Sequence, residues 1–191
     1  MSRIAIFASG TGSNFDAIKA AIDRNELQAE IALIVCDKPG AKVVEKAENA
    51  GIDVFQFTPK TYASKQAFET EIVKELHAKG VNLVVLAGYM RLVGDTLLAA
   101  YGGKIVNIHP SLLPAFPGKD AIGQAIEAGV KVSGVTIHYV DEGMDTGPII
   151  AQESMKLSTD DSYEEVQQRI QAIEHSLYPK VIANVLKEAT A

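Results

Sequence analysis

The run Ile4-Ala5-Ile6-Phe7-Ala8-Ser9-Gly10-Thr11-Gly12-Ser13-Asn14 decides the fold of this 191-residue chain. Its five successive apolar residues predict a strand that is buried on both faces, as in a parallel sheet. Phe15, Ile18 and Ile22 then recur at helical spacing, so the glycine-containing turn joins this strand to a helix. A buried strand that passes through a tight turn into a helix is typical of a doubly wound α/β fold.

The alternation of strand and helix continues along the rest of the chain. Short apolar runs predict further strands at residues 31–35, 53–57, 83–87, 104–108, 135–140 and 149–153. Helical periodicity predicts helices at residues 41–50, 64–79 and 120–128, and a last helix that begins near Ser158 and Asp161. Pro179 predicts a kink or a restart within that last helix. We expect a single, mostly parallel, Rossmann-like sheet with helices on both faces.

One strand in the second half differs from the others. Apolar and polar side chains alternate from Val135 to Val140, which predicts a half-exposed strand that runs antiparallel at the edge of the sheet. His138 lies on this strand, where it is either a surface residue or a wall of a site.

Composition and charge exclude several classes of protein. The chain has a net charge of −6, which argues against a surface for nucleic acid or anionic membranes. No apolar run reaches the roughly 18 residues of a membrane-spanning helix, and Met1 leads into a strand without a signal-peptide pattern, so a cytoplasmic protein is expected. The single cysteine, Cys36, cannot form an internal disulfide, and no histidine or carboxylate set has the spacing of a metal site.

The turn from Ser9 to Asn14 is the first candidate site. Glycines allow the backbone to approach a ligand, and the free N–H groups of a helix N-terminus favour an anion such as phosphate. Ser13 and Asn14 add side-chain donors or cap the helix, and a tight turn without any ligand is the alternative. A dinucleotide site would require a further glycine where Phe15 stands, although Asp37 could imitate its acidic ribose contact.

The second candidate site is the segment from Asn107 to Pro114, at the carboxyl end of a predicted strand. Asn107 and His109 point to the same side of an extended segment, where an amide donor and an imidazole can stabilise an oxyanion and move a proton. Asp145 lies in the turn Asp141–Pro148, and its carboxylate would favour a protonated His109 if the two were close. Without that proximity, this turn is an acidic surface turn.

These segments together resemble the phosphoribosylglycinamide formyltransferases, a group within the folate-dependent formyltransferase family. The resemblance extends from Arg3 to about Val185 in the same order. It is most specific in four segments, residues 9–14, 86–91, 107–114 and 145–148. Methionyl-tRNA formyltransferases and formyltetrahydrofolate deformylases carry an additional domain, for which this chain is expected to be too short.

The resemblance implies the transfer of a formyl group from 10-formyltetrahydrofolate, a co-substrate, to the amine of 5-phosphoribosylglycinamide. The products would be formylglycinamide ribonucleotide and tetrahydrofolate, in de novo purine (IMP) biosynthesis, with no metal required. The implied partners are these two small molecules, without nucleic acid or membrane, and the protein would be a monomer or a homodimer. Residues 1–191 would form one domain, with a phosphate-binding half at 1–100 and a folate-binding and catalytic half at 101–191.

The resemblance also implies the site residues. The catalytic residues would be Asn107, His109 and Asp145. The ribonucleotide and its phosphate would contact Gly12, Ser13, Asn14 and Glu174. The folate would contact Lys65, Met90, Arg91, Leu92, Val93, Asn107 and Asp141. Lys65 stands where some members have arginine; a lysine keeps the positive charge but cannot form the bidentate hydrogen bonds that arginine makes with a carboxylate. Lys119-Asp120 stands where other members have a histidine-bearing segment. A nucleotide-binding or regulatory module without catalysis is the alternative function.

Overall fold

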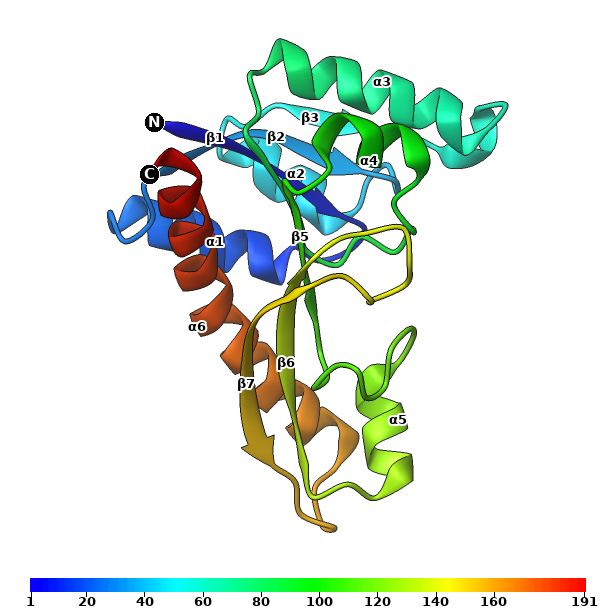
Figure 1. Cartoon of the computed structure of the whole chain (residues 1–191), viewed down its shortest axis with the longest axis vertical. Coiled ribbons are helices and arrows are strands. Elements are labelled where there is room, and N and C mark those ends of the chain that lie inside the picture. The colour runs from blue at the N-terminus through cyan, green and yellow to red at the C-terminus, as the bar shows by residue number, and fades with distance from the viewer.

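A single seven-stranded sheet organises the molecule, with the strand order β3-β2-β1-β4-β5-β6-β7 (Figure 1). The computed structural model describes residues 1–191. The strands are β1 (Ser2–Ala8), β2 (Ala29–Cys36), β3 (Val54–Gln56), β4 (Leu83–Leu86), β5 (Ile105–His109), β6 (Val132–Tyr139) and β7 (Ile149–Lys156). The α-helices are α1 (Ser13–Asp23), α2 (Lys42–Asn49), α3 (Lys65–Ala78), α4 (Asp95–Tyr101), α5 (Ala121–Ala128) and α6 (Tyr163–Thr190). A short 3₁₀ turn covers Pro59–Thr61.

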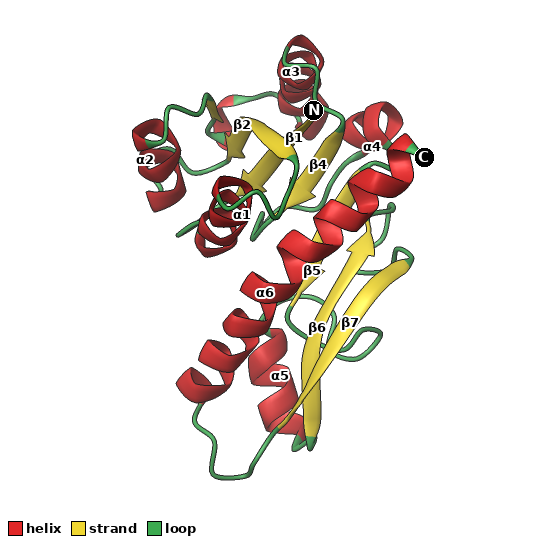
Figure 2. Cartoon of the chain, turned by 90° about the vertical axis from the view of Figure 1, so that its left-hand side faces the viewer, coloured by secondary structure: helices red, strands yellow, loops and turns green.

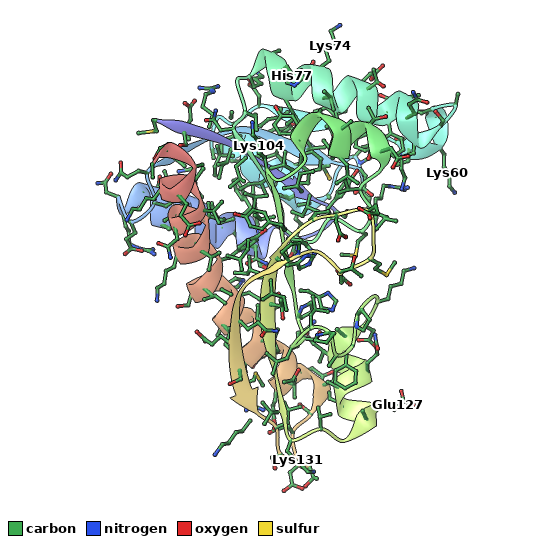
Figure 3. The ribbon with its side chains drawn as sticks, in the orientation of Figure 1. Lys60, Lys74, His77, Lys104, Glu127 and Lys131 are labelled. Carbon is green, nitrogen blue, oxygen red and sulfur yellow. The ribbon has the colours of Figure 1, made fainter.

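Helices cover both faces of the sheet, as the sequence predicted (Figure 2). Successive residues of β1 belong to two different cores: Ile4 and Ile6 pack with side chains of α1, α2 and α6, whereas Ala5 and Phe7 pack with those of α3 and α4. Because side chains alternate across a strand, a strand that is apolar at every position must be covered on both sides. The predicted α/β fold class is confirmed.

The strand β6 runs antiparallel to both of its neighbours, β5 and β7. The antiparallel direction was predicted correctly, but the half-exposed edge position was wrong. Its polar side chains Thr136 and His138 are almost completely buried, and β7 forms the edge instead. The hydroxyl of Thr136 donates to the carbonyl of Ser111 and accepts from the N–H of Leu113, so the loop after β5 covers this face of β6.

Two helices differ from the sequence prediction. The helix α4 was missed, because its seven residues offer only Leu97 and Tyr101 as buried apolar positions and no periodic pattern can develop. The helix α6 begins at Tyr163 rather than near Ser158, because Ser162 and Glu165 form a reciprocal capping box. It continues through Pro179 to Thr190, so the helix does not restart at the proline. None of the helices has the length and apolar character needed to cross a membrane.

The side chain of Tyr178 attaches α6 to the middle of the sheet. It is fully buried, and its hydroxyl donates to the carbonyl of Leu86 in β4 at 2.7 Å and lies 3.3 Å from the carbonyl of Val106 in β5. Leu86 is the last residue of β4, so this contact places the middle of α6 over the carboxyl end of that strand, where a site is expected.

We expect Tyr178→Phe to lower the free energy of unfolding by about 1–2 kcal/mol, because the buried carbonyl of Leu86 loses a donor. Urea denaturation measures this change. The matched control is Tyr62→Phe, whose hydroxyl bonds Glu71 at the surface and whose loss should cost less than about 0.5 kcal/mol. Equal effects of the two substitutions would contradict an anchoring role for Tyr178.

Candidate active site

A cavity of about 760 Å³ opens at the carboxyl ends of β1, β4 and β5. Its lining comes from the turn at residues 10–14, from residues 86–93, from the end of β5 and the loop after it, and from α6. The turn between β6 and β7 adds Gly143, Met144 and Asp145. Ligand sites of open α/β sheets lie at this edge. The three candidate segments of the sequence therefore line one cavity.

The turn after β1 presents unpaired backbone donors to the cavity. The N–H groups of Gly12, Ser13 and Asn14 donate no hydrogen bond within the chain. Gly12 has a φ of +76°, and a Cβ atom there would lie 2.8 Å from Cγ2 of Val43, so only glycine fits. Asn14 is buried, and its Oδ1 has no partner. Free donors at the N-terminus of α1 are suited to an anion.

Glu174 reaches the cavity from α6, opposite this turn. It is 9% exposed, and burial raises the pKa of its carboxyl from 4.5 to about 7, an effect that the nearby Asn14 side chain partly offsets. A buried carboxyl group beside unpaired polar atoms is a favourable partner for the hydroxyl or amine groups of a ligand.

Asn107 and His109 lie at the end of β5, and both line the cavity as predicted. Nε2 of His109 lies 2.8 Å from the carbonyl oxygen of Phe116. Because a carbonyl oxygen can only accept, this contact places a proton on Nε2. The remaining nitrogen, Nδ1, lies 3.5 Å from Oδ2 of Asp145. A proton on Nδ1 would therefore point at the carboxylate of Asp145.

Asp145 is held in place by a hydrogen bond from the loop after β5. Its φ of +57° is unusual for a residue other than glycine, and its Oδ2 accepts a hydrogen bond from the N–H of Gly118 at 2.8 Å. Backbone in such a sparsely populated region is often found at functional sites. The structure thus supplies the proximity to His109 that the sequence could not show. Donors and a proton carrier in one cavity can stabilise an oxyanion and transfer a proton.

His138 belongs to this group, although the sequence left its position open. The register of β5 and β6 places it opposite Asn107, and its Nδ1 lies 2.8 Å from the carbonyl oxygen of Tyr139. Its Nε2 is therefore an acceptor in the neutral ring and lies 3.3 Å from Nδ2 of Asn107. This contact orients the Asn107 amide. The cross-strand register is the signal that would have identified His138.

The segment that follows β4 forms another wall of the cavity. Met90, Arg91, Leu92 and Val93 all line it, as predicted. No intramolecular hydrogen bond uses the backbone N–H of Arg91 or Leu92. Met90 and Leu92 are exposed at 67% and 45%, which is unusual for large apolar side chains. Unpaired backbone groups between apolar side chains suit a flat heteroaromatic ligand.

The structure places three of the sequence candidates away from the cavity wall. Lys65 does not line the cavity, and its Nζ donates to the carbonyl of Leu92 at 2.8 Å. Asp141 does not line it either, since its Oδ1 accepts from Gly143 N–H and Thr146 Oγ1 within the turn, which lowers its pKa. Asp37, considered as a ribose contact, is buried with its oxygens bonded to Ser9 and Arg91.

The fold and this site define an α/β enzyme with a turn of free N–H donors suited to an anion and a histidine–carboxylate pair. A family model described as formyl transferase matches residues 2–182. The chain is 59% identical to the phosphoribosylglycinamide formyltransferase of Bacillus subtilis, over 97% of this chain and 95% of that protein. The crystal structure of phosphoribosylglycinamide formyltransferase from Bacillus halodurans superposes with a TM-score of 0.95 at 58% identity, covering 98% and 97% of the two chains.

A further relative is the trifunctional purine biosynthetic protein adenosine-3 of Drosophila melanogaster, which is 41% identical over 95% of this chain and 14% of its own length. The chain belongs to the formyl transferase family, a family of transferase enzymes. The resemblance inferred from the four sequence segments is confirmed.

The raised pKa of Glu174 predicts a pH dependence of stability. Between pH 4.5 and about 7 the folded protein retains a proton that the unfolded chain releases, so ionisation of Glu174 lowers the free energy of unfolding as pH rises. Glu174→Gln cannot ionise. Its stability relative to wild type should increase by about 3 kcal/mol across this window and level off above it.

Urea denaturation at several pH values measures this difference. Glu153→Gln, at an exposed position of β7, is the matched control and should show no such trend. A stability difference between Glu174→Gln and wild type that is the same at every pH would contradict the prediction.

Proposed function

We propose that this chain transfers a formyl group from 10-formyltetrahydrofolate to the amine of 5-phosphoribosylglycinamide, giving formylglycinamide ribonucleotide and tetrahydrofolate in purine biosynthesis. The names of the relatives from Bacillus subtilis and Drosophila melanogaster support this activity. The observation that carries the proposal is the placement of Asn107, His109 and Asp145 in one cavity, between an anion-binding turn and a wall of unpaired backbone groups.

The ribonucleotide would bind at the end of the cavity formed by α1 and α6. Its phosphate would accept hydrogen bonds from the N–H groups of Gly12, Ser13 and Asn14, which have no other partner. Glu174 would hold the ribose hydroxyls or the glycinamide end, because its carboxyl group faces the same cavity from α6. This orientation would direct the amine of the substrate toward β5.

The folate would bind along the segment from Met90 to Val93. Its pterin ring can accept hydrogen bonds from the free N–H groups of Arg91 and Leu92 and pack against the exposed Met90 and Leu92 side chains. Lys65 would support this wall from behind, through its bond to the Leu92 carbonyl. Asp141 would act by shaping the turn that carries Asp145.

In the reaction, the amine nitrogen attacks the formyl carbon, and the carbonyl electron pair moves to oxygen. The Asn107 amide and the protonated His109 stabilise the oxyanion. The oxyanion electron pair then re-forms the carbonyl, the bond from the carbon to N10 of the folate breaks with its electron pair left on N10, and the proton lost by the amine is delivered there. Asp145 balances the charge of the protonated His109 and relays this proton, directly or through water. Residues 1–191 act as one catalytic unit.

We expect Asp145→Asn to reduce turnover by about two orders of magnitude or more, because an amide cannot balance the charge of His109 or accept a proton. A spectrophotometric assay of tetrahydrofolate release with both substrates measures it. Asp160→Asn, an exposed aspartate in the loop before α6, is the matched control and should retain wild-type turnover.

Turnover of Asp145→Asn near the wild-type rate would remove Asp145 from the chemistry. A wild-type protein that releases no tetrahydrofolate would refute the proposed function. Thermal-shift measurements with glycinamide ribonucleotide, a folate analogue and NAD distinguish the enzyme from a nucleotide-binding module, because only the first two should stabilise it.

A further inference from the structure

Asp37 is a buried carboxylate that lies behind the cavity rather than in it. It follows β2 directly, is 4% exposed and does not line the cavity. Its Oδ1 accepts a hydrogen bond from Oγ of Ser9 at 2.5 Å, and its Oδ2 accepts one from Nε of Arg91 at 2.9 Å. A buried charge requires partners of this kind, and both partners adjoin segments of the cavity wall.

Ser9 extends this network into the folate-side wall. Its Oγ donates to Asp37 and also accepts a hydrogen bond from the backbone N–H of Met90 at 3.0 Å. Its own N–H donates to the carbonyl of Gly88. One carboxylate therefore orients the residue that begins the anion-binding turn and, through it, the first residue of the Met90–Val93 segment.

The Met90–Val93 segment depends on such side-chain contacts because it is neither helix nor strand. Besides the bond from Met90 to Ser9, its fixed points are the Lys65 bond to the Leu92 carbonyl and the buried Glu69, which accepts from the N–H of Gly94. The contacts of Lys65 and Glu69 hold the far end of the segment. The side-chain hydrogen bonds that hold the end nearest the anion-binding turn are those of Ser9 and Asp37.

We propose that Asp37 is a positioning residue that sets the place of the Met90–Val93 backbone relative to the anion-binding turn. The inference rests on the proposed function, in which the free backbone groups of this segment bind the pterin ring. A ring recognised by backbone groups requires a fixed backbone, and small displacements of a binding wall can cost large factors in affinity. Asp37 acts on the folate through Ser9 and Arg91 and does not touch it.

The test is Asp37→Asn, which preserves shape but replaces one acceptor oxygen with a donor group. An NH₂ group cannot accept from Ser9 or Arg91, so at least one of the two hydrogen bonds loses its acceptor, and the negative charge opposite Arg91 is removed. We expect the KM for 10-formyltetrahydrofolate and the calorimetric Kd for tetrahydrofolate to rise by about tenfold or more. The turnover number should stay within about threefold of wild type, because Asn107, His109 and Asp145 are untouched.

Two further variants complete the experiment. Asp53→Asn, just before β3, removes a carboxylate that pairs with Lys79 at the surface, and its affinity for tetrahydrofolate should change less than about twofold. Ser9→Ala removes the acceptor of the Met90 N–H and should reproduce the weaker folate binding of Asp37→Asn. If Asp37→Asn does not fold, the folate affinity of Ser9→Ala tests the proposal instead.

A folded Asp37→Asn that binds tetrahydrofolate as tightly as wild type would overturn the inference, as would a loss of turnover with unchanged KM. If Asp37→Asn does not fold, wild-type affinity in Ser9→Ala would overturn it as well. Wild-type protein that binds tetrahydrofolate but transfers no formyl group would refute the proposed function alone. Wild-type protein that binds no tetrahydrofolate would overturn both.

Discussion

The antiparallel pairing of β6 with β5 places Asn107 opposite His138 and His109 opposite Thr136. Because side chains alternate with a period of two, a shift of one residue in this register would turn His138 away from the cavity. The same pairing determines where the chain leaves β6, and hence where the turn brings Asp145 to within 3.5 Å of His109. Much of the geometry of the candidate catalytic group therefore depends on one strand pairing.

Three buried carboxyl groups lie in or near the cavity wall, and they differ in the partners that compensate for their burial. Asp37 is bonded by Ser9 and Arg91, and Glu69 accepts from the backbone N–H groups of Gly94 and Leu97. Glu174 has no charged partner, and its pKa rises to about 7. A charge without a partner inside a protein shifts toward its neutral form, whereas a partnered charge can order the backbone around it. Asp37 and Glu69 are therefore suited to ordering the backbone of the cavity wall, and Glu174 is suited to binding a ligand.

Much of the fold could be predicted, because continuous apolar runs such as Ile4–Ala8 have few alternatives to a buried parallel strand. The predicted elements were wrong where an apolar pattern was too short to recognise, or where another segment covers residues whose pattern suggested exposure to solvent. The helix α4 has only seven residues, and the alternating pattern of β6 suggested exposure although the loop after β5 covers its polar face. The side chains of Lys65 and Asp141 bond to a backbone carbonyl and to their own turn, and the folate contact predicted for each of them stays a prediction.

The sequence by itself determined the α/β fold, the glycine-containing turn before α1 and the identity of Asn107, His109 and Asp145 as candidates, because these depend on local patterns of residue type and spacing. Only the tertiary structure decided that Asp145 faces His109, that His138 contacts the Asn107 amide and that Asp37 bonds both Ser9 and Arg91. Each of these contacts joins residues about thirty or more positions apart in the chain. Such contacts are set by strand order and register, to which no local pattern of residues corresponds.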